Sequence, residues 1–238
     1  VTTKITRRAL LGAAGAGVVT LGSAEAAALA ASSEASGSRE PHYAMVFDQN
    51  KCVGCGDCKA ACNEANHLPP GISRLLMERQ SKSHRVIGKE PCGKLEECDC
   101  ERKYVRVSCQ QCQDAPCVTV CPTGAAHHDP ETGIVTMDPD RCVGCKYCIV
   151  ACPYNARFIN AETKVADNCD FCLHTRFAEG RKPACVESCK YDALVFGNVN
   201  DPYSYISRLI RAKDTVRIRP ELGTRPSLRY IPFVKKGA

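Results

Sequence analysis

The feature that most constrains this chain is a run of four closely spaced cysteines, Cys142-Val-Gly-Cys145-Lys-Tyr-Cys148-Ile-Val-Ala-Cys152-Pro153. At this spacing, C-x2-C-x2-C-x3-C-P, three thiolates surround one [4Fe–4S] cluster and the fourth serves a second cluster. Gly144 permits the tight turn, because it has no Cβ to clash. The run therefore predicts a partner motif that supplies a ligand in return.

Three further groups of four cysteines supply candidates for that partner. They are group one (Cys52, Cys55, Cys58, Cys62), group two (Cys109, Cys112, Cys117, Cys121) and group four (Cys169, Cys172, Cys185, Cys189), with the run above as group three. Groups two and three both end in Cys-Pro, whereas Asn63 and Lys190 follow groups one and four. We therefore pair group two with group three, and group one with group four.

Reciprocal exchange of the fourth ligand then predicts four [4Fe–4S] clusters. Their expected ligands are Cys52, Cys55, Cys58 and Cys189 for cluster 1; Cys62, Cys169, Cys172 and Cys185 for cluster 2; Cys109, Cys112, Cys117 and Cys152 for cluster 3; and Cys121, Cys142, Cys145 and Cys148 for cluster 4. The expected fold is α+β, with two nested ferredoxin-like domains. The first comprises residues 43–105 and 165–200, the second residues 106–164, and residues 201–238 form a helix and an extended C-terminal tail.

Composition supports clusters over the other uses of cysteine. A chain of 238 residues with 19 cysteines is either a disulfide scaffold or a metalloprotein, and the repeated C-x2-C spacing favours metal. The formal net charge of +6 does not indicate nucleic-acid binding. Four clusters with their thiolates would carry about −2 each and outweigh it.

The N-terminal segment, residues 1–30, resembles a twin-arginine signal peptide. Lys4, Arg7 and Arg8 precede an apolar stretch at 9–21, and A-x-A cleavage sites follow. An uncleaved N-terminal anchor is the alternative. Twin-arginine export carries folded proteins, which suits clusters inserted before export, so the expected location is the periplasm.

Three cysteines fall outside the four groups, in a polar insert at 81–103. Cys92, Cys98 and Cys100 lie among carboxylates and near His84, and their spacing matches no standard metal site. Two interpretations stay open: a loop with one disulfide and one free thiol, or an extra metal site.

Short elements are expected between the cysteine groups. Strands are predicted at 43–47, 72–77, 104–108 and 193–196, hairpins at 125–137 and 158–165, and a helix beginning at Pro202 with Ile206, Leu209 and Ile210 on its apolar face. His127 and His128 are expected to be solvated. The basic residues of the loop 173–184 (His174, Arg176, Arg181, Lys182) either support a cluster electrostatically or form a solvated face.

The nesting and the four spacings resemble the four-cluster electron-transfer subunits of respiratory oxidoreductases, over about residues 43–212. Within that family the sequence is most similar to the NrfC type, through the run at 142–154, Pro183-Ala-Cys185-Val-Glu-Ser and Phe196-Gly-Asn198. The resemblance implies an NrfD-type quinol-interacting membrane subunit and a multihaem cytochrome or molybdopterin catalytic subunit as partners, the subunit being membrane-associated through its partner.

Three functional hypotheses remain. The first is an electron-transfer subunit for formate-dependent nitrite reduction, without catalytic residues of its own. The second is the iron–sulfur subunit of a molybdopterin sulfur-compound reductase acting on tetrathionate, thiosulfate or polysulfide. The third is a zinc or disulfide structural module.

Overall fold

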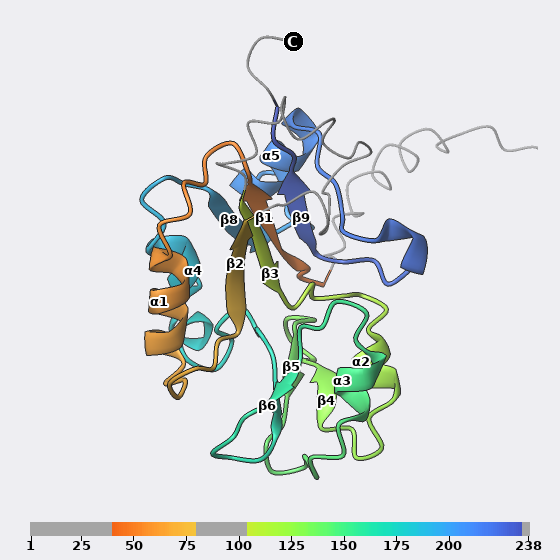
Figure 1. The fold of residues 1–238 in the computed structure, drawn as a ribbon. Coiled ribbons are helices and arrows are strands. Elements are labelled where there is room, and N and C mark those ends of the chain that lie inside the picture. Colours follow the sequence, from red (N-terminus) through yellow and green to blue (C-terminus); the bar gives the residue numbers. More distant parts are fainter. Residues whose placement is uncertain (1–39, 80–103, 235–238) are drawn as a thin grey trace, which may run out of the picture. The chain divides into compact units, whose positions relative to one another are not determined.

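The part of the chain that can be described comprises residues 40–79 and 104–234 of a computed structural model (Figure 1). The predicted signal segment and the insert with Cys92, Cys98 and Cys100 lie outside these residues, so the predictions for them stay predictions. Within the described residues, no helix has the length and apolar character needed to cross a bilayer. The elements are short helices and small sheets, which confirms the α+β class.

A three-stranded sheet joins segments that are far apart in sequence (Figure 1). Its centre is β1 (Tyr43–Asp48), which pairs antiparallel with β8 (Leu194–Asn198) and parallel with β9 (Leu228–Ile231). Side chains alternate along β1: Met45 and Phe47 enter the main core, whereas Ala44 and Val46 enter a smaller one. The sheet therefore separates two hydrophobic clusters.

Helix α5 (Tyr205–Ala212) covers the smaller cluster. Its predicted apolar residues Ile206, Leu209 and Ile210 pack there with Ala44 and Val46. The predicted start at Pro202 is wrong: the helix begins at Tyr205, because Ser204 caps it by accepting a hydrogen bond from the Ser207 amide.

The predicted extended C-terminal tail packs on its own domain, in part as a core strand. Residues 201–238 include β9, whose Leu228 and Tyr230 are fully buried in the main core. Strand β9 occupies the free edge of β1, with Phe47 opposite Tyr230. Pairing satisfies the backbone groups of that edge, which explains why the segment is a core strand.

Four short helices carry cysteines of the four groups. They are α1 (Asp57–Ala65), α2 (Pro116–Thr119), α3 (Tyr147–Ala151) and α4 (Ala184–Glu187). Helix α1 packs against α4, and α2 packs against α3 (Figure 1). Groups one and four are thus neighbours in space, as are groups two and three.

The remaining elements are hairpins and short 3-10 turns. The hairpins are β2 (Leu75–Arg79) with β3 (Tyr104–Ser108), β4 (Ala126–His128) with β5 (Val135–Met137), and β6 (Phe158–Ile159) with β7 (Ala166–Asp167). The 3-10 turns are η2 (Phe177–Glu179) and η3 (Pro220–Leu222). The strand predicted at 104–108 matches β3, and both predicted hairpins are present.

Candidate metal centres

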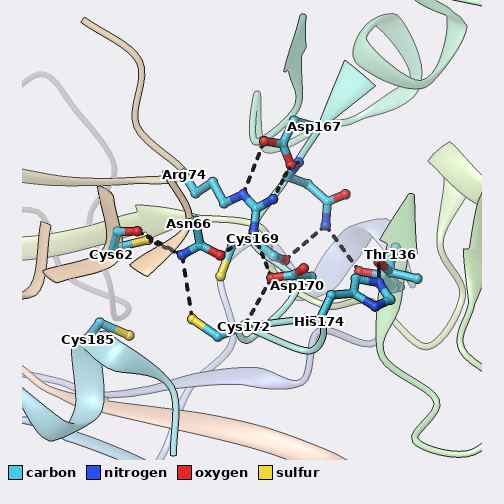
Figure 2. Close-up of polar contacts among 12 residues, drawn as sticks. Cys62, Asn66, Arg74, Thr136, Asp167, Cys169, Asp170, Cys172, His174 and Cys185 are labelled. Atoms are coloured by element: carbon cyan, nitrogen blue, oxygen red, sulfur yellow. Dashed lines mark hydrogen bonds and ion pairs between the residues drawn. The ribbon is translucent and has the colours of Figure 1, made fainter. Parts of the chain in front are cut away.

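Cysteines from groups one and four lie together in two sets. Burial raises the pKa of the Cys52 thiol first, and the thiols of Cys58, Cys189 and Cys55 raise it further. A second set surrounds Cys62, whose pKa is raised by burial and then by Cys169, Cys185 and Cys172. The sulfurs of this second set gather around one space beside Asn66 (Figure 2).

Cysteines of groups two and three also lie near one another. The pKa of Cys112 is raised to about 12 by burial and then by the thiols of Cys117 and Cys152. Burial followed by Cys117, Cys142 and Cys121 raises the pKa of Cys148. Cys145 is exposed and lies between Cys142 and Cys148 in sequence.

Neighbouring sets follow one another in an order that is indicated by the electrostatic effect of a thiol in one set on a thiol in the next. The Cys58 thiol of the first set contributes to the raised pKa of Cys185 in the second. Cys169 of the second set contributes to the raised pKa of Cys109, in group two. Cys117 of that group contributes to the raised pKa of Cys148, in the last set. The cysteines therefore form a row of sets rather than a single cluster of thiols.

Both ends of this row reach the surface. Cys55 and Cys145 are exposed. At one end, the exposed side chains of Val53 and Tyr191 line the same pocket as Cys55. At the other end, the segment around Cys145 exposes Val143, Tyr147 and Val150. The cysteines of the two middle sets are mostly buried.

The tight turns at these exposed cysteines depend on glycine. Gly54 and Gly144 both precede the exposed cysteine and have φ of 75° and 66°. A Cβ on Gly144 would lie 2.9 Å from the Lys164 carbonyl oxygen, and one on Gly54 would overlap the Tyr104 ring. The predicted role of Gly144 is thus confirmed, and Gly54 has the same role in group one.

Backbone amides point at several of the sulfurs. The amides of Ala126, Ala166 and Ala193 donate hydrogen bonds to the sulfurs of Cys121, Cys142 and Cys189, at 3.3, 3.4 and 3.3 Å. Burial works to raise the pKa of Cys121, but the hydrogen bonds from Ala126, Thr123 and Ala125 lower it overall. Such N–H donors stabilise a thiolate, which is the form that binds metal.

The donor set fits an iron–sulfur cluster better than it fits free thiols. Burial, followed by the thiols of Cys169, Cys172 and Cys58, raises the pKa of Cys185 to about 12, although Arg106 acts against this rise. Four thiolates this close repel one another unless a cationic core binds them all, and a coordinating thiol is deprotonated outright. Cys52, Cys55, Cys58 and Cys189 also line one small pocket, together with apolar residues that include Phe47 and Met77.

Two simpler arrangements are not seen in the described part of the chain. All sixteen cysteines of the four groups are free thiols there. No three Cys, His, Asp or Glu side chains of the described residues are arranged to hold a single metal ion.

A polar network supports the set around Cys62 (Figure 2). The Asn66 amide donates to the sulfurs of Cys62 and Cys172, at 3.7 and 3.6 Å. Arg74 holds Asn66 in place by donating to its Oδ1 at 2.8 Å, and Arg74 also pairs with Asp170, whose Oδ1 accepts from the Cys172 amide. The network joins α1 to the loop that carries group four.

Sequence reasoning missed two buried charged side chains that influence the cysteines electrostatically, Arg106 and Arg157. Both are buried, and both face cysteines. Alternation in β3 places Arg106 on the face opposite to Val105 and Val107, and all three are buried, so the strand pattern alone did not indicate that Arg106 is buried.

Three basic residues of the loop 173–184 that the sequence analysis singled out contact other side chains rather than sulfurs. Arg176 pairs with Glu187, Arg181 with Glu179 and Glu187, and His174 contacts Thr136. His127 and His128 are half-buried, and each ring contacts a nearby backbone carbonyl oxygen.

Comparison with known proteins places these features in a wider group. A family model described as a 4Fe-4S dicluster domain matches residues 100–199. The sequence is 50% identical over 191 residues to Protein NrfC of Escherichia coli K12, covering 80% of this protein and 81% of that one. It is 44% identical over 195 residues to the B subunit of the polysulfide reductase of Wolinella succinogenes (82% and 96%), and 42% identical over 175 residues to Thiosulfate reductase electron transfer subunit PhsB of Salmonella typhi (74% and 84%).

Proposed function

This protein belongs to the NrfC-like family of iron–sulfur electron-transfer subunits, and from that premise we propose that it binds four [4Fe–4S] clusters and relays electrons through them. The clusters supply one-electron outer-sphere transfer, at potentials that hydrogen bonds, local charge and exposure adjust. The observation that carries this proposal is the row of cysteine sets, each combining cysteines from two groups.

The proposed ligands are the sixteen cysteines of the four groups. We assign Cys52, Cys55, Cys58 and Cys189 to cluster 1, Cys62, Cys169, Cys172 and Cys185 to cluster 2, Cys109, Cys112, Cys117 and Cys152 to cluster 3, and Cys121, Cys142, Cys145 and Cys148 to cluster 4. The packing of α1 on α4 and of α2 on α3 supports this exchange. It also supports two nested ferredoxin-like domains, 43–105 with 165–200 and 106–164.

Electrons would enter and leave at the two ends of the row. Cys55 and Cys145 are exposed, whereas the thiols between them are largely buried. Because the thiols of the middle sets are largely buried, the two end clusters would be the accessible ones. Apolar side chains beside Cys145, with Val150 at 86% exposure, suit contact with another protein subunit.

The proposed partners are a quinol-oxidising membrane subunit of the NrfD type and a terminal reductase, as in formate-dependent nitrite reduction. The identity to NrfC supports this assignment. The second candidate is a molybdopterin sulfur-compound reductase, which the polysulfide and thiosulfate reductase subunits favour. The subunit that co-purifies with this protein, a multihaem cytochrome or a molybdopterin protein, distinguishes the two.

The proposed location is the periplasmic side of the membrane. The Arg7-Arg8 pair and the apolar stretch after it support export of the folded protein by the twin-arginine route. Replacing both arginines with lysine should keep the cluster-loaded protein in the cytoplasm, which fractionation of cells would detect.

The ligand assignment is tested by a substitution at the exposed end. Cys145→Ser in the protein co-expressed with its partners should remove or convert cluster 4, because serine replaces a thiolate ligand. Val143→Ser is the matched control, since Val143 is in the same turn and 69% exposed. Full iron content and unchanged paramagnetic spectra of the reduced Cys145→Ser protein would refute the assignment.

A further inference from the structure

Two buried arginines lie among the cysteines and have no carboxylate partner in the described part of the chain. Arg106 is 0% exposed and Arg157 is 4% exposed. No Asp or Glu of the described residues forms an ion pair with either. A buried guanidinium without a counter-charge is strongly unfavourable, so each requires a negative group nearby.

For Arg106, the negative groups are thiolates of the first two sets. Its Nη2 lies 3.7 Å from the Cys169 sulfur and 4.0 Å from the Cys185 sulfur, while Nη1 donates to the Ser108 hydroxyl. The charge of the same guanidinium also works to lower the pKa of Cys58, a thiol of the neighbouring set. Arg106 in β3 therefore contacts cysteines of the proposed cluster 2 and influences a cysteine of the proposed cluster 1.

Arg157 has the corresponding position in the other half. None of its three guanidinium nitrogens makes a hydrogen bond of good geometry with another described residue. Burial works to lower its pKa, but the thiols of Cys117, Cys109 and Cys148 raise it overall. The buried, unpaired guanidinium of Arg157 is therefore under the influence of cysteines assigned to cluster 3 (Cys117, Cys109) and to cluster 4 (Cys148).

Other arginines near the cysteines show what ordinary pairing looks like here. Arg74 is neutralised by Asp167 and Asp170, at 3.0 and 2.9 Å (Figure 2). Arg176, in the loop of group four, is paired with Glu187. The positive charges of Arg106 and Arg157, by contrast, interact mainly with the cysteines.

We propose that Arg106 and Arg157 are tuning residues that raise the reduction potentials of the clusters whose cysteines they influence, Arg106 for clusters 1 and 2 and Arg157 for clusters 3 and 4. This rests on the proposed function, because it requires clusters in the four sets. Reduction adds a negative charge to a cluster, and a fixed positive charge in a poorly solvated site stabilises that state. One arginine shared by two clusters raises both potentials together, which keeps neighbouring steps of the relay close in energy.

The test is a redox titration of the anaerobically purified complex, followed by the paramagnetic signals of the reduced clusters. The neutral variants Arg106→Gln, Arg106→Met, Arg157→Gln and Arg157→Met are compared with Arg106→Lys, Arg157→Lys and the control Arg176→Met. In each neutral variant, at fixed solution potential, the ratio of reduced to oxidised cluster should fall at least tenfold for two clusters, a shift of about 59 mV for one electron. The other two clusters should change much less.

Lysine variants should shift the same two clusters by less than the neutral ones do, because the charge remains. Full iron loading with unchanged potentials in the neutral variants would overturn the proposal. Loss of iron from both neutral variants at one position, with full loading in the lysine variant, would also overturn it there, because the arginine would then serve cluster retention. A wild-type complex without iron would instead refute the proposed function.

Discussion

The Asn66 side-chain amide lies 3.6 Å from the Cys172 sulfur, 106 residues away in sequence, and also donates to the sulfur of Cys62. An N–H donor at a thiolate stabilises its negative charge, so this amide favours the reduced state of the proposed cluster 2. Asn66→Ala should lower the reduction potential of that cluster and cost about 1 kcal/mol of stability.

Redox titration and denaturant unfolding of the loaded protein measure these two effects. Asn200→Ala is a suitable control, because Asn200 bonds a backbone carbonyl outside the cysteine sets. If Asn66→Ala left all four potentials at their wild-type values, the amide would have no influence on the cluster.

The turn before Cys145 should tolerate no side chain at Gly144. Its φ is 66°, and a Cβ there would lie 2.9 Å from the Lys164 carbonyl oxygen, so Gly144→Ala is strained at a cost of about 1–3 kcal/mol. Iron content and thermal unfolding temperature should both fall. Lys146, two residues on, also has a positive φ of 68°, so Lys146→Gly should instead be neutral or stabilise by about 1 kcal/mol. Equal destabilisation by both changes would contradict this account of the turn.

Strand β9 should be essential for the sheet, and Tyr230 tests this. Its ring packs edge-on against Phe47, and its hydroxyl donates to the Arg106 carbonyl oxygen at 2.9 Å. Tyr230→Ala should cost about 3–5 kcal/mol, and Tyr230→Phe about 1–2 kcal/mol, because the first leaves a cavity and the second an unpaired carbonyl. Chemical denaturation checks both values. Tyr203→Phe, at an 85% exposed position, should leave stability unchanged.

Much of the cysteine arrangement could be predicted from sequence, because ligand spacing is a local property that reciprocity extends to distant groups. Strand β9 could not be predicted from the sequence. It has four residues, one of them Arg229, and it stands in a basic segment rich in proline and glycine. The free edge of β1 and an antiparallel bridge from Val216 to Tyr230 give those residues their partners, and both are tertiary features. Arg106 was missed for a related reason: a charged residue at a core position is recognised only when its thiol neighbours are known.

The free energy of unfolding should depend on pH through His42, which directly precedes β1. Burial, and then the charges of Arg229, Arg217 and Arg225, lower the pKa of His42 in the folded protein. The unfolded chain therefore takes up a proton more readily, so stability falls as pH drops through the ordinary value of 6.5 and levels off below the folded pKa. His42→Gln should remove this part of the pH dependence in unfolding measurements between about pH 7.5 and 5. An identical pH slope in variant and wild type would show that His42 does not contribute.

The central claim is that sixteen cysteines hold four iron–sulfur clusters in a row. Its most direct test is iron and acid-labile sulfide analysis of the intact complex, isolated without oxygen, with each subunit quantified. The account predicts about sixteen iron and sixteen sulfide per molecule of this subunit. A colourless protein with little iron, or with zinc or disulfides in its place, would contradict it.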